Sequence, residues 1–295
     1  MTDKIIIGGS GSQGIAARVA HKMGATFGNV EIKTFPDGEK YLRIHTPVDG
    51  KEVIVIQTMG FRPDSLLMEM LFLNETLSEI GAAKITGVIP YFAYSRQDVS
   101  FKAGEVVSFR VVSKLLEFSG LEELYTVDIH LHRVEDAGKM FNIPCHNLTA
   151  MPLIGEFIRD NYSLNDPKVI APDEEAEQWA RAMSEELDAD FVVMKKVRKG
   201  PEDVEISSGE LDVKGRDVVI ADDIISTGGT MAEAISIAKE AGASNVIAAC
   251  THPLLIGGAR SLIHQAGALE VIGTDTVPSS VRVVSIDKLL AESLK

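Results

Sequence analysis

Short apolar runs alternate with amphipathic segments along the whole chain. Apolar runs bounded by polar turns occur at residues 5–7, 30–35, 53–56, 85–90, 124–127, 168–170, 191–194 and 218–221. Apolar residues recur at helical spacing at residues 15–23, 64–80, 106–118 and 231–238. Continuous apolar runs are typical of parallel strands buried on both faces, so the pattern predicts an α/β protein with mainly parallel sheets flanked by helices.

The second half of the chain repeats the pattern of the first. Lys168-Val-Ile matches Lys4-Ile-Ile, and glycine-bounded helices precede corresponding apolar strands in both halves. A repeat of this length indicates a duplicated domain. We therefore predict two α/β domains, residues 1–146 and 147–295.

The sequence VVIADDIISTGGT at residues 218–230 contains the clearest candidate for a binding site. Its apolar strand leads into Asp222 and Asp223, and a predicted helix follows the motif. Hydroxyls and unobstructed backbone N–H groups stand where that helix begins, at Ser226, Thr227, Gly228, Gly229 and Thr230. Such a helix N-terminus binds phosphate, whereas carboxylates repel it and instead accept hydrogen bonds from sugar hydroxyls or hold hydrated Mg²⁺. The motif predicts a sugar-phosphate site; the alternative is a capped turn with solvated acids.

Polar segments also follow three predicted strands of the first half. A turn signal, Phe35-Pro-Asp37-Gly38-Glu39, follows the strand that begins at Val30, and Arg96, Gln97 and Asp98 follow the aromatic cluster after residues 85–90. His130 follows the strand at 124–127. Ligands of open α/β sheets bind at this carboxyl edge, and aromatic residues beside Arg and Gln suit a planar base and a phosphate chain. The alternatives are a solvated turn, aromatic packing with a surface arginine, and a histidine satisfied by hydrogen bonds.

Two further segments of the second half carry candidate chemistry. Asp173 follows the strand at 168–170, at the edge where Asp222 is expected. Residues 195–201 form the densest cationic cluster of the chain, and a polar stretch continues to Gly209. A charge run is usually a solvated loop, but cations on a flap can close over a polyphosphate and stabilise charge that develops during transfer.

The composition of the chain argues against several classes of function. Among 295 residues, 29 Lys and Arg against 43 Asp and Glu give a net charge of −14, which argues against nonspecific binding to nucleic acid. The two cysteines have no zinc-site or disulfide spacing. The chain lacks a long apolar run and a signal-peptide pattern, so we expect a cytoplasmic protein with no membrane contact.

Residues 218–230 resemble the signature of the phosphoribosyltransferase superfamily, and the other motifs together resemble one of its branches, the ribose-phosphate pyrophosphokinase family. The resemblance covers nearly the whole chain and implies two duplicated, Rossmann-like domains of the phosphoribosyltransferase type. It implies transfer of the diphosphoryl group of Mg–ATP to the C1 hydroxyl of ribose 5-phosphate, with release of AMP, for nucleotide biosynthesis.

The resemblance also implies a role for each candidate residue. Lys196 and Arg198 fall on the catalytic flexible loop, and Arg198 also contacts ribose 5-phosphate. His130 and Asp173 match the residues associated with Mg²⁺, the expected cofactor. ATP, the co-substrate, would contact Phe35, Asp37, Gly38, Glu39, Arg96, Gln97, Asp98 and His130. Ribose 5-phosphate would contact Asp222, Asp223, Ser226, Thr227, Gly228, Gly229 and Thr230.

Departures from the family pattern limit what the resemblance implies. Glu174 and Glu175 stand where bacterial relatives usually have Gly-Gly, and the segment after Asp98 lacks their arginines, as in archaeal forms. Phosphate activation and ADP inhibition are therefore not carried over. Two rival hypotheses remain: a phosphoribosyltransferase that uses the same loop with a base, and a noncatalytic regulatory homologue. The resemblance and the Leu-rich helix at 64–80 favour a homo-oligomer.

Overall fold

The fold is taken from a computed structural model, which describes residues 4–100, 102–131, 137–194, 196–198, 204–206 and 211–295. For residues 196–198 and 204–206 it describes the backbone alone. The chain divides into two compact units, one formed by residues up to Leu148 together with Ser285–Lys295, and the other by Thr149–Val284. Each unit is built around one six-stranded sheet.

Both sheets have the same strand order, and every strand pair within them is parallel. The first sheet, in spatial order, contains β2 (Thr26–Phe27), β1 (Lys4–Gly8), β5 (Glu52–Ile56), β6 (Lys84–Ile89), β7 (Glu123–Val127) and β8 (Cys145–Leu148). The second contains β10 (Asp190–Val193), β9 (Lys168–Ala171), β13 (Val218–Ile225), β14 (Val246–Pro253), β15 (Glu270–Thr274) and β16 (Arg282–Val284). The α/β class and the duplication predicted from the sequence are thus confirmed.

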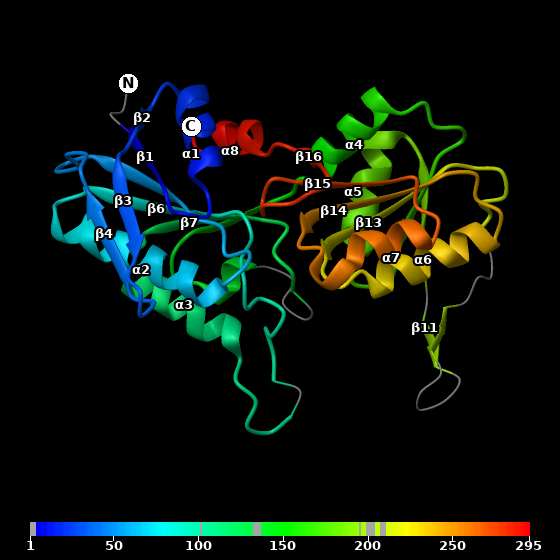
Figure 1. The fold of residues 1–295 in the computed structure, drawn as a ribbon, viewed down its shortest axis with the longest axis horizontal. Coiled ribbons are helices and arrows are strands. Elements are labelled where there is room, and N and C mark those ends of the chain that lie inside the picture. Colours follow the sequence, from blue (N-terminus) through cyan, green and yellow to red (C-terminus); the bar gives the residue numbers. More distant parts are fainter. Residues whose placement is uncertain (1–3, 101, 132–136, 195, 199–203, 207–210) are drawn as a thin grey trace. The chain divides into compact units, whose positions relative to one another are not determined.

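Helices cover both faces of each sheet (Figure 1). In the first unit these are α1 (Gln13–Met23), α2 (Pro63–Glu79), α3 (Ser108–Phe118) and α8 (Asp287–Ser293), with the 3₁₀ turn η1 (Ala137–Met140). In the second they are α4 (Met151–Asn161), α5 (Glu177–Leu187), α6 (Gly229–Glu240) and α7 (Ala259–Gln265), with η2 (Ile256–Gly258). Central strands are buried on both faces, which explains why they read as continuous apolar runs.

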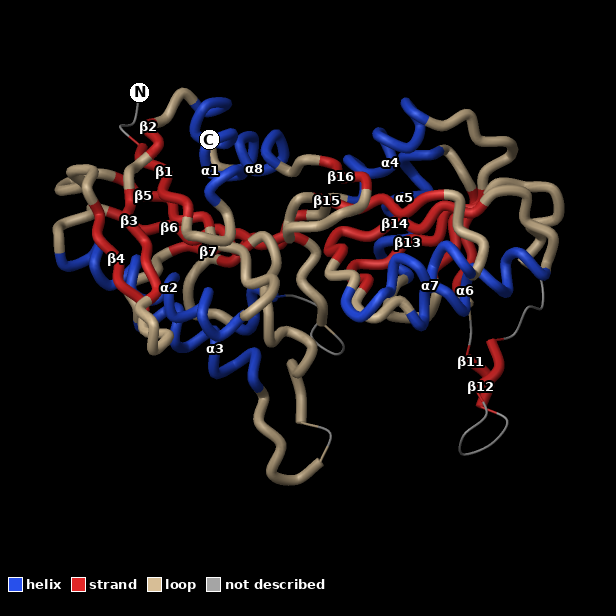
Figure 2. The backbone as a smooth tube through the Cα atoms, viewed as in Figure 1, coloured by secondary structure: helices blue, strands red, loops and turns tan. Residues whose placement is uncertain are grey.

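Each unit also carries a hairpin that is not part of its main sheet (Figure 2). In the first unit β3 (Val30–Thr34) pairs antiparallel with β4 (Lys40–Ile44), between β2 and β5 along the chain. In the second, β11 (Lys196–Arg198) pairs with β12 (Val204–Ile206), between β10 and β13. Because β2 and β10 occupy the same place in the two sheets, these hairpins are equivalent insertions in the two copies.

The last helix of the chain packs in the first unit. In α8, Leu290 is fully buried, and Asp287 accepts a hydrogen bond from Arg18 of α1 at 3.1 Å. In the second unit α4, the helix that follows β8, packs against α5 in the same way, with an ion pair between Arg159 and Glu186. The two repeats therefore exchange their terminal helices. The sequence analysis had assigned residues 285–295 to the second domain, because position along the chain does not reveal such an exchange.

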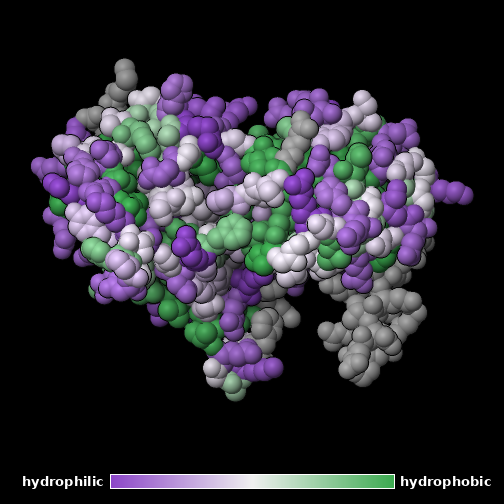
Figure 3. Space-filling model, in the orientation of Figure 1, coloured by the Kyte–Doolittle hydropathy of each residue, from purple (hydrophilic) through white to green (hydrophobic). Residues whose placement is uncertain are grey.

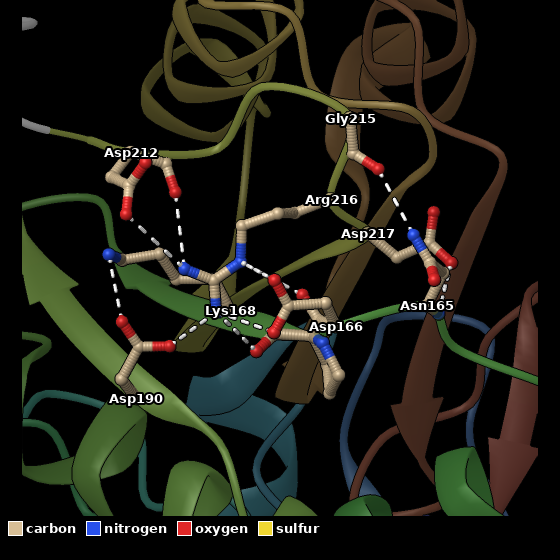
Figure 4. A network of polar contacts seen from close by, with 9 residues as sticks. Asn165, Asp166, Lys168, Asp190, Asp212, Gly215, Arg216 and Asp217 are labelled. Carbon is tan, nitrogen blue, oxygen red and sulfur yellow. Dashed lines mark hydrogen bonds and ion pairs between the residues drawn. The ribbon is translucent and has the colours of Figure 1, made fainter.

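A network of ion pairs joins the amino-terminal ends of the strands in the second unit (Figure 4). Arg216, just before β13, contacts Asp166 at 3.0 Å and Asp190, the first residue of β10, at 2.6 Å. Lys168, the first residue of β9, contacts the other oxygen of Asp190 at 2.9 Å. Burial alone would raise the pKa of Asp190, but the hydrogen bonds from Arg216 and Lys168 outweigh it and hold this pKa below its usual value. The opposite, carboxyl edge of the sheet carries the predicted site.

Candidate active site

The phosphate-loop motif lies where the sequence analysis expected it, but its strand is longer. β13 continues to Ile225, because Ile224 and Ile225 still pair with β14. Asp222 and Asp223 therefore lie inside the strand and not in the following loop. The loop itself is reduced to residues 226–228, and α6 starts at Gly229.

The geometry of the two glycines suits an anion at the start of α6. Gly228 has φ +79°, and a Cβ there would lie 3.0 Å from the Cβ of Ala259. A Cβ on Gly229, in contrast, would meet no atom within 4 Å. Among the described residues no side chain caps this helix start. The helix start thus has no side-chain cap from the described residues and has free space beside Gly229, two conditions for binding a phosphate there.

Three carboxylates come together beside this loop. Asp223 is buried, Asp222 is partly exposed, and the N–H of Asp223 donates to Oδ1 of Asp222 at 2.9 Å. Burial raises the pKa of Asp222 well above its usual value, and the charges of Asp223 and Asp173 raise it further. Asp173 follows the neighbouring strand β9, and its Oδ1 accepts a hydrogen bond from the N–H of Ala176 at 3.2 Å. Such a group of acids favours hydroxyl donors or a cation over a second anion.

In the first unit the segment at residues 94–98 follows β6 at the carboxyl edge of the sheet. Tyr94 adopts φ +68° and donates a hydrogen bond from its hydroxyl to Asp64 in the first turn of α2. Arg96 is exposed, Gln97 is partly exposed, and Asp98 is buried. The side chain of Arg96 is therefore presented to solvent by a segment whose backbone is held in a strained conformation, a feature that clusters at functional sites.

Strain recurs at the end of the next strand. Asp128 follows β7 with φ +40°, is buried, and donates its N–H to the carbonyl of Leu148 at 2.7 Å. His130 lies two residues further and is partly exposed. Because β6 and β7 are neighbours, His130 and the segment at 94–98 follow adjacent strands at one edge of the sheet.

The turn predicted at residues 35–39 is the tip of the β3–β4 hairpin. Its backbone is closed by hydrogen bonds from the N–H of Phe35 to the carbonyl of Glu39 (2.8 Å) and from that of Gly38 to the carbonyl of Phe35 (2.9 Å). Asp37 accepts the N–H of Glu39 at 3.1 Å, and Gly38 adopts φ +100°. The ring of Phe35 is half exposed. The turn thus presents one aromatic ring and two acids to solvent.

The predicted catalytic residues Lys196 and Arg198 stand at the two ends of β11. Most of the predicted flap, including Lys195 and residues 199–203, lies outside the described residues. The antiparallel pairing of Lys196 with Ile206 and of Arg198 with Val204 makes this segment a hairpin and not a plain loop.

The sequence analysis missed two charged residues that meet at the β3–β4 hairpin of the first unit. Lys40 at the start of β4 pairs with Glu69, which is fully buried on α2. The available signal was a glutamate on the apolar stripe of this helix, between Leu66 and Leu73. The sequence analysis considered only the apolar residues of that helix.

The described residues contain no group of three or more His, Cys, Asp or Glu side chains arranged to hold a metal ion. No helix in the described ranges is long and apolar enough to cross a membrane.

Comparison with known proteins identifies relatives over the full chain. A family model for the N-terminal domain of ribose phosphate pyrophosphokinase matches residues 4–120, and one for the phosphoribosyl transferase domain matches residues 148–282. The chain is 44% identical to a ribose-phosphate pyrophosphokinase of Methanothermobacter thermautotrophicus, over 99% of this chain and 100% of that one. It is 41% identical to the enzyme of the same name from Methanobrevibacter smithii, again over 99% and 100% of the two chains.

A solved structure agrees with these relatives. The crystal structure of phosphoribosylpyrophosphate synthetase from Mycobacterium smegmatis matches with a TM-score of 0.89 at 28% identity, covering 99% of this chain and 98% of that one. Similarity of this extent includes both units, and not the phosphate loop alone. The chain belongs to the ribose-phosphate pyrophosphokinase family.

Proposed function

We infer that the protein is a ribose-phosphate diphosphokinase that forms 5-phosphoribosyl 1-diphosphate and AMP from ATP and ribose 5-phosphate. The C1 hydroxyl attacks the β-phosphorus of ATP, the bond between β-phosphorus and the α,β-bridging oxygen breaks, and AMP departs with that oxygen while the hydroxyl proton passes to solvent. The observation that carries this inference is the similarity to ribose-phosphate pyrophosphokinases over both domains, because a phosphoribosyltransferase would share only the second. The loop at the end of β13, with space beside Gly229 and acids on its strand, supplies the two recognition elements that a sugar phosphate requires.

We propose that the second domain binds ribose 5-phosphate. Its phosphate would accept hydrogen bonds from the N–H and hydroxyl groups of residues 226–230, at the positive end of α6. Asp222 and Asp223 would accept hydrogen bonds from the vicinal hydroxyls of the ribose. The closeness of Asp173, Asp222 and Asp223 supports this assignment, because a cluster of acids favours neutral hydroxyl donors over another anion.

We propose that ATP binds to the first domain. The exposed ring of Phe35 offers a surface for the base, and the acids Asp37 and Glu39 at the same turn can accept hydrogen bonds from amino or hydroxyl groups. Arg96 and Gln97, at the end of β6, would contact the phosphate chain, with Asp98 and His130 beside them.

The residues present are compatible with Mg²⁺ held largely by substrate. Mg²⁺ commonly keeps several waters and takes one or two carboxylates together with substrate phosphates, so a complete protein cage is not required. Asp173 supplies a carboxylate oxygen at the edge of the second sheet, and His130 a ring nitrogen or a hydrogen bond to a bound water at the edge of the first. The ion would neutralise phosphate charge during transfer.

We propose Lys196 and Arg198 as the catalytic cations, with Arg198 also contacting ribose 5-phosphate. Both residues lie on the hairpin that follows β10 along the chain. In the sheet, β10 is the neighbour of β9 and lies two strands from β13, and this place supports the role.

The substitution Lys196→Ala should lower kcat by about two to three orders of magnitude, because it removes a group that stabilises charge in the transition state. ATP should still bind. Unchanged turnover would refute the assignment.

The reaction itself is tested by AMP formation. ATP, ribose 5-phosphate and Mg²⁺ should give AMP in a one-to-one ratio with 5-phosphoribosyl 1-diphosphate, and omission of either substrate or of Mg²⁺ should stop it. A phosphoribosyltransferase would instead convert 5-phosphoribosyl 1-diphosphate and a base to a nucleotide and diphosphate, and it would form no AMP from ATP and ribose 5-phosphate. A noncatalytic homologue would bind the ligands and form neither product.

We also propose that the protein forms homo-oligomers through the first domain. Large apolar side chains are exposed on α2 and α3, at Met68, Phe72, Val111, Leu115 and Phe118. The two helices are linked where Asn74 of α2 donates to Ser119, just after α3, at 3.1 Å. Hydrophobic residues over α3 are visible at the lower edge of the first unit in Figure 3. An exposed apolar surface of this kind is typical of a subunit contact.

A further inference from the structure

The buried carboxylate of Glu69 lies where three segments of the first unit meet. Its side chain has no exposed surface, and it is reached from the loop after β1, from the end of β5 and from the start of β4. Nothing in the proposed reaction uses this residue directly. A buried charge is costly unless it is fully paired, so its partners indicate what it holds together.

Four donors surround the two oxygens of Glu69. The N–H of Ser10 donates to Oε1 at 2.5 Å, and its hydroxyl to Oε2 at 2.8 Å. The side-chain amide of Gln57 donates to Oε1 at 2.6 Å. The ammonium of Lys40 lies 3.1 Å from Oε2 and is the cation of this network.

The loop after β1 is shaped to fit this network. The carbonyl oxygen of the Gln57 side chain also accepts the N–H of Gly11 at 3.0 Å. A Cβ on Gly9 would lie 2.5 Å from the Gln57 side chain, so only glycine allows Gln57 to reach this position. Ser10 and Gln57 are therefore fixed parts of the sheet edge, and Glu69 is held rigidly between them.

Lys40 is the member of the network that belongs to the hairpin. It is the residue directly after the turn at 35–39, and it pairs with Thr34 across the hairpin. Among the described residues, β3 and β4 pair with each other and with no strand of the main sheet, and Val30, Leu42 and Ile44 of the hairpin pack against the core. Val30 and Ile44 stand at the end of the hairpin remote from the turn. Lys40 thus attaches the turn end of the hairpin to the core. This contact matters because a two-stranded ribbon alone is only marginally stable.

We propose that Glu69 is a positioning residue for the nucleotide: by holding Lys40 it fixes the turn that presents Phe35, Asp37 and Glu39. The proposal rests on the proposed binding of ATP to this turn, and it extends that function to a residue that does not touch the substrate. A turn held in place before binding loses less conformational freedom when the nucleotide arrives, and small displacements of such groups are costly.

Lys40→Met tests the anchor, because methionine keeps an unbranched side chain only one atom shorter and removes the charge. We expect the amides of Phe35 and Gly38 to exchange faster with solvent in the absence of any ligand. We expect KM for ATP to rise by up to about a hundredfold, because a displaced positioning group can cost that much, with kcat and KM for ribose 5-phosphate little changed. Lys40→Arg, which keeps the charge, should restore most of the affinity.

Lys33→Met is the matched control. Lys33 lies on the same hairpin and pairs with Glu31, but its side chain is largely exposed and does not reach the core. This variant should keep the exchange rates and the KM for ATP of the original protein. Glu69→Gln should resemble Lys40→Met, and the double variant should be no worse than the more affected single variant, because both changes remove one interaction.

The outcomes separate the anchor from the proposed reaction. If Lys40→Met lowers the melting temperature but leaves KM for ATP unchanged, Glu69 has only a structural role and the proposal is wrong. Equal losses in kcat and in both KM values would also overturn it. If the original protein forms no AMP, the proposed function fails, while the exchange of Phe35 and Gly38 still decides whether Lys40 holds the turn.

Discussion

Gly228 ends the phosphate loop in a conformation that an L-residue adopts only at a cost. Its φ of +79° and the nearby Cβ of Ala259 leave no room for a side chain. We expect Gly228→Ala to destabilise the protein by about 2 kcal/mol, from the left-handed backbone and the close contact together. Thermal unfolding measures this loss, and KM for ribose 5-phosphate should rise with it, because the loop must shift.

Gly229→Ala is the matched control for that change. Its Cβ enters open space, and alanine favours a helix more than glycine does, so stability should be unchanged or higher. A phosphate bound above this residue would nevertheless be obstructed, so KM for ribose 5-phosphate should rise. Unchanged KM in Gly229→Ala would place the phosphate elsewhere and contradict the site proposed for this loop.

The strands and helices that carry the candidate site could be predicted only as far as local pattern specifies them. The apolar strand at 218–221 was found, but its continuation through two aspartates to Ile225 was not, because strand pairing with β14 outweighs the poor strand preference of the acids. The segment at 196–206 was recognised by its charge and not as a hairpin. Glu69 was missed because its partners Ser10, Lys40 and Gln57 are brought together only by the fold.

The exchanged helix α8 gives a prediction at the level of whole elements. Removal of residues 285–295 takes away the buried side chains of Leu290 and Leu294 and the partner of Arg18. We expect faster hydrogen exchange in α1 of the first unit and unchanged protection in α5 of the second. Leu290→Ala should have a similar effect at a cost of about 2–5 kcal/mol, the usual range for a buried leucine.

Lys288→Ala serves as the control for α8, because Lys288 is exposed on the same helix. It should leave exchange in α1 unchanged. If truncation instead lowers protection in the second unit, α8 belongs there, and the exchange of terminal helices between repeats is wrong.

At the scale of the whole molecule, duplication supplies two sheets with the same strand order and two equivalent hairpins. Divergence then separates their chemistry. One hairpin presents the aromatic and acidic turn at 35–39, and the other carries Lys196 and Arg198. Among the residues that the structure describes, only those of the second unit form the phosphate loop. At the end of β5, the strand equivalent to β13, the first unit has Gln57, whose amide binds an internal carboxylate. A single duplicated architecture thus accounts for two units to which we assign different substrates.

The exposed apolar surface of α2 and α3 leads to the prediction at the largest scale. Phe118 is 88% exposed and Phe72 42% exposed, which is unfavourable for aromatic rings unless another subunit covers them. We expect the native protein to sediment as an oligomer, and Phe72→Asp to shift it toward monomer, because a buried charge without a partner opposes association. Leu262→Asp, on α7 of the second unit with a similar exposure of 43%, should leave the sedimentation coefficient unchanged. A protein that is monomeric at micromolar concentration, or an oligomer that Leu262→Asp disrupts while Phe72→Asp does not, would show that subunits do not associate through α2 and α3.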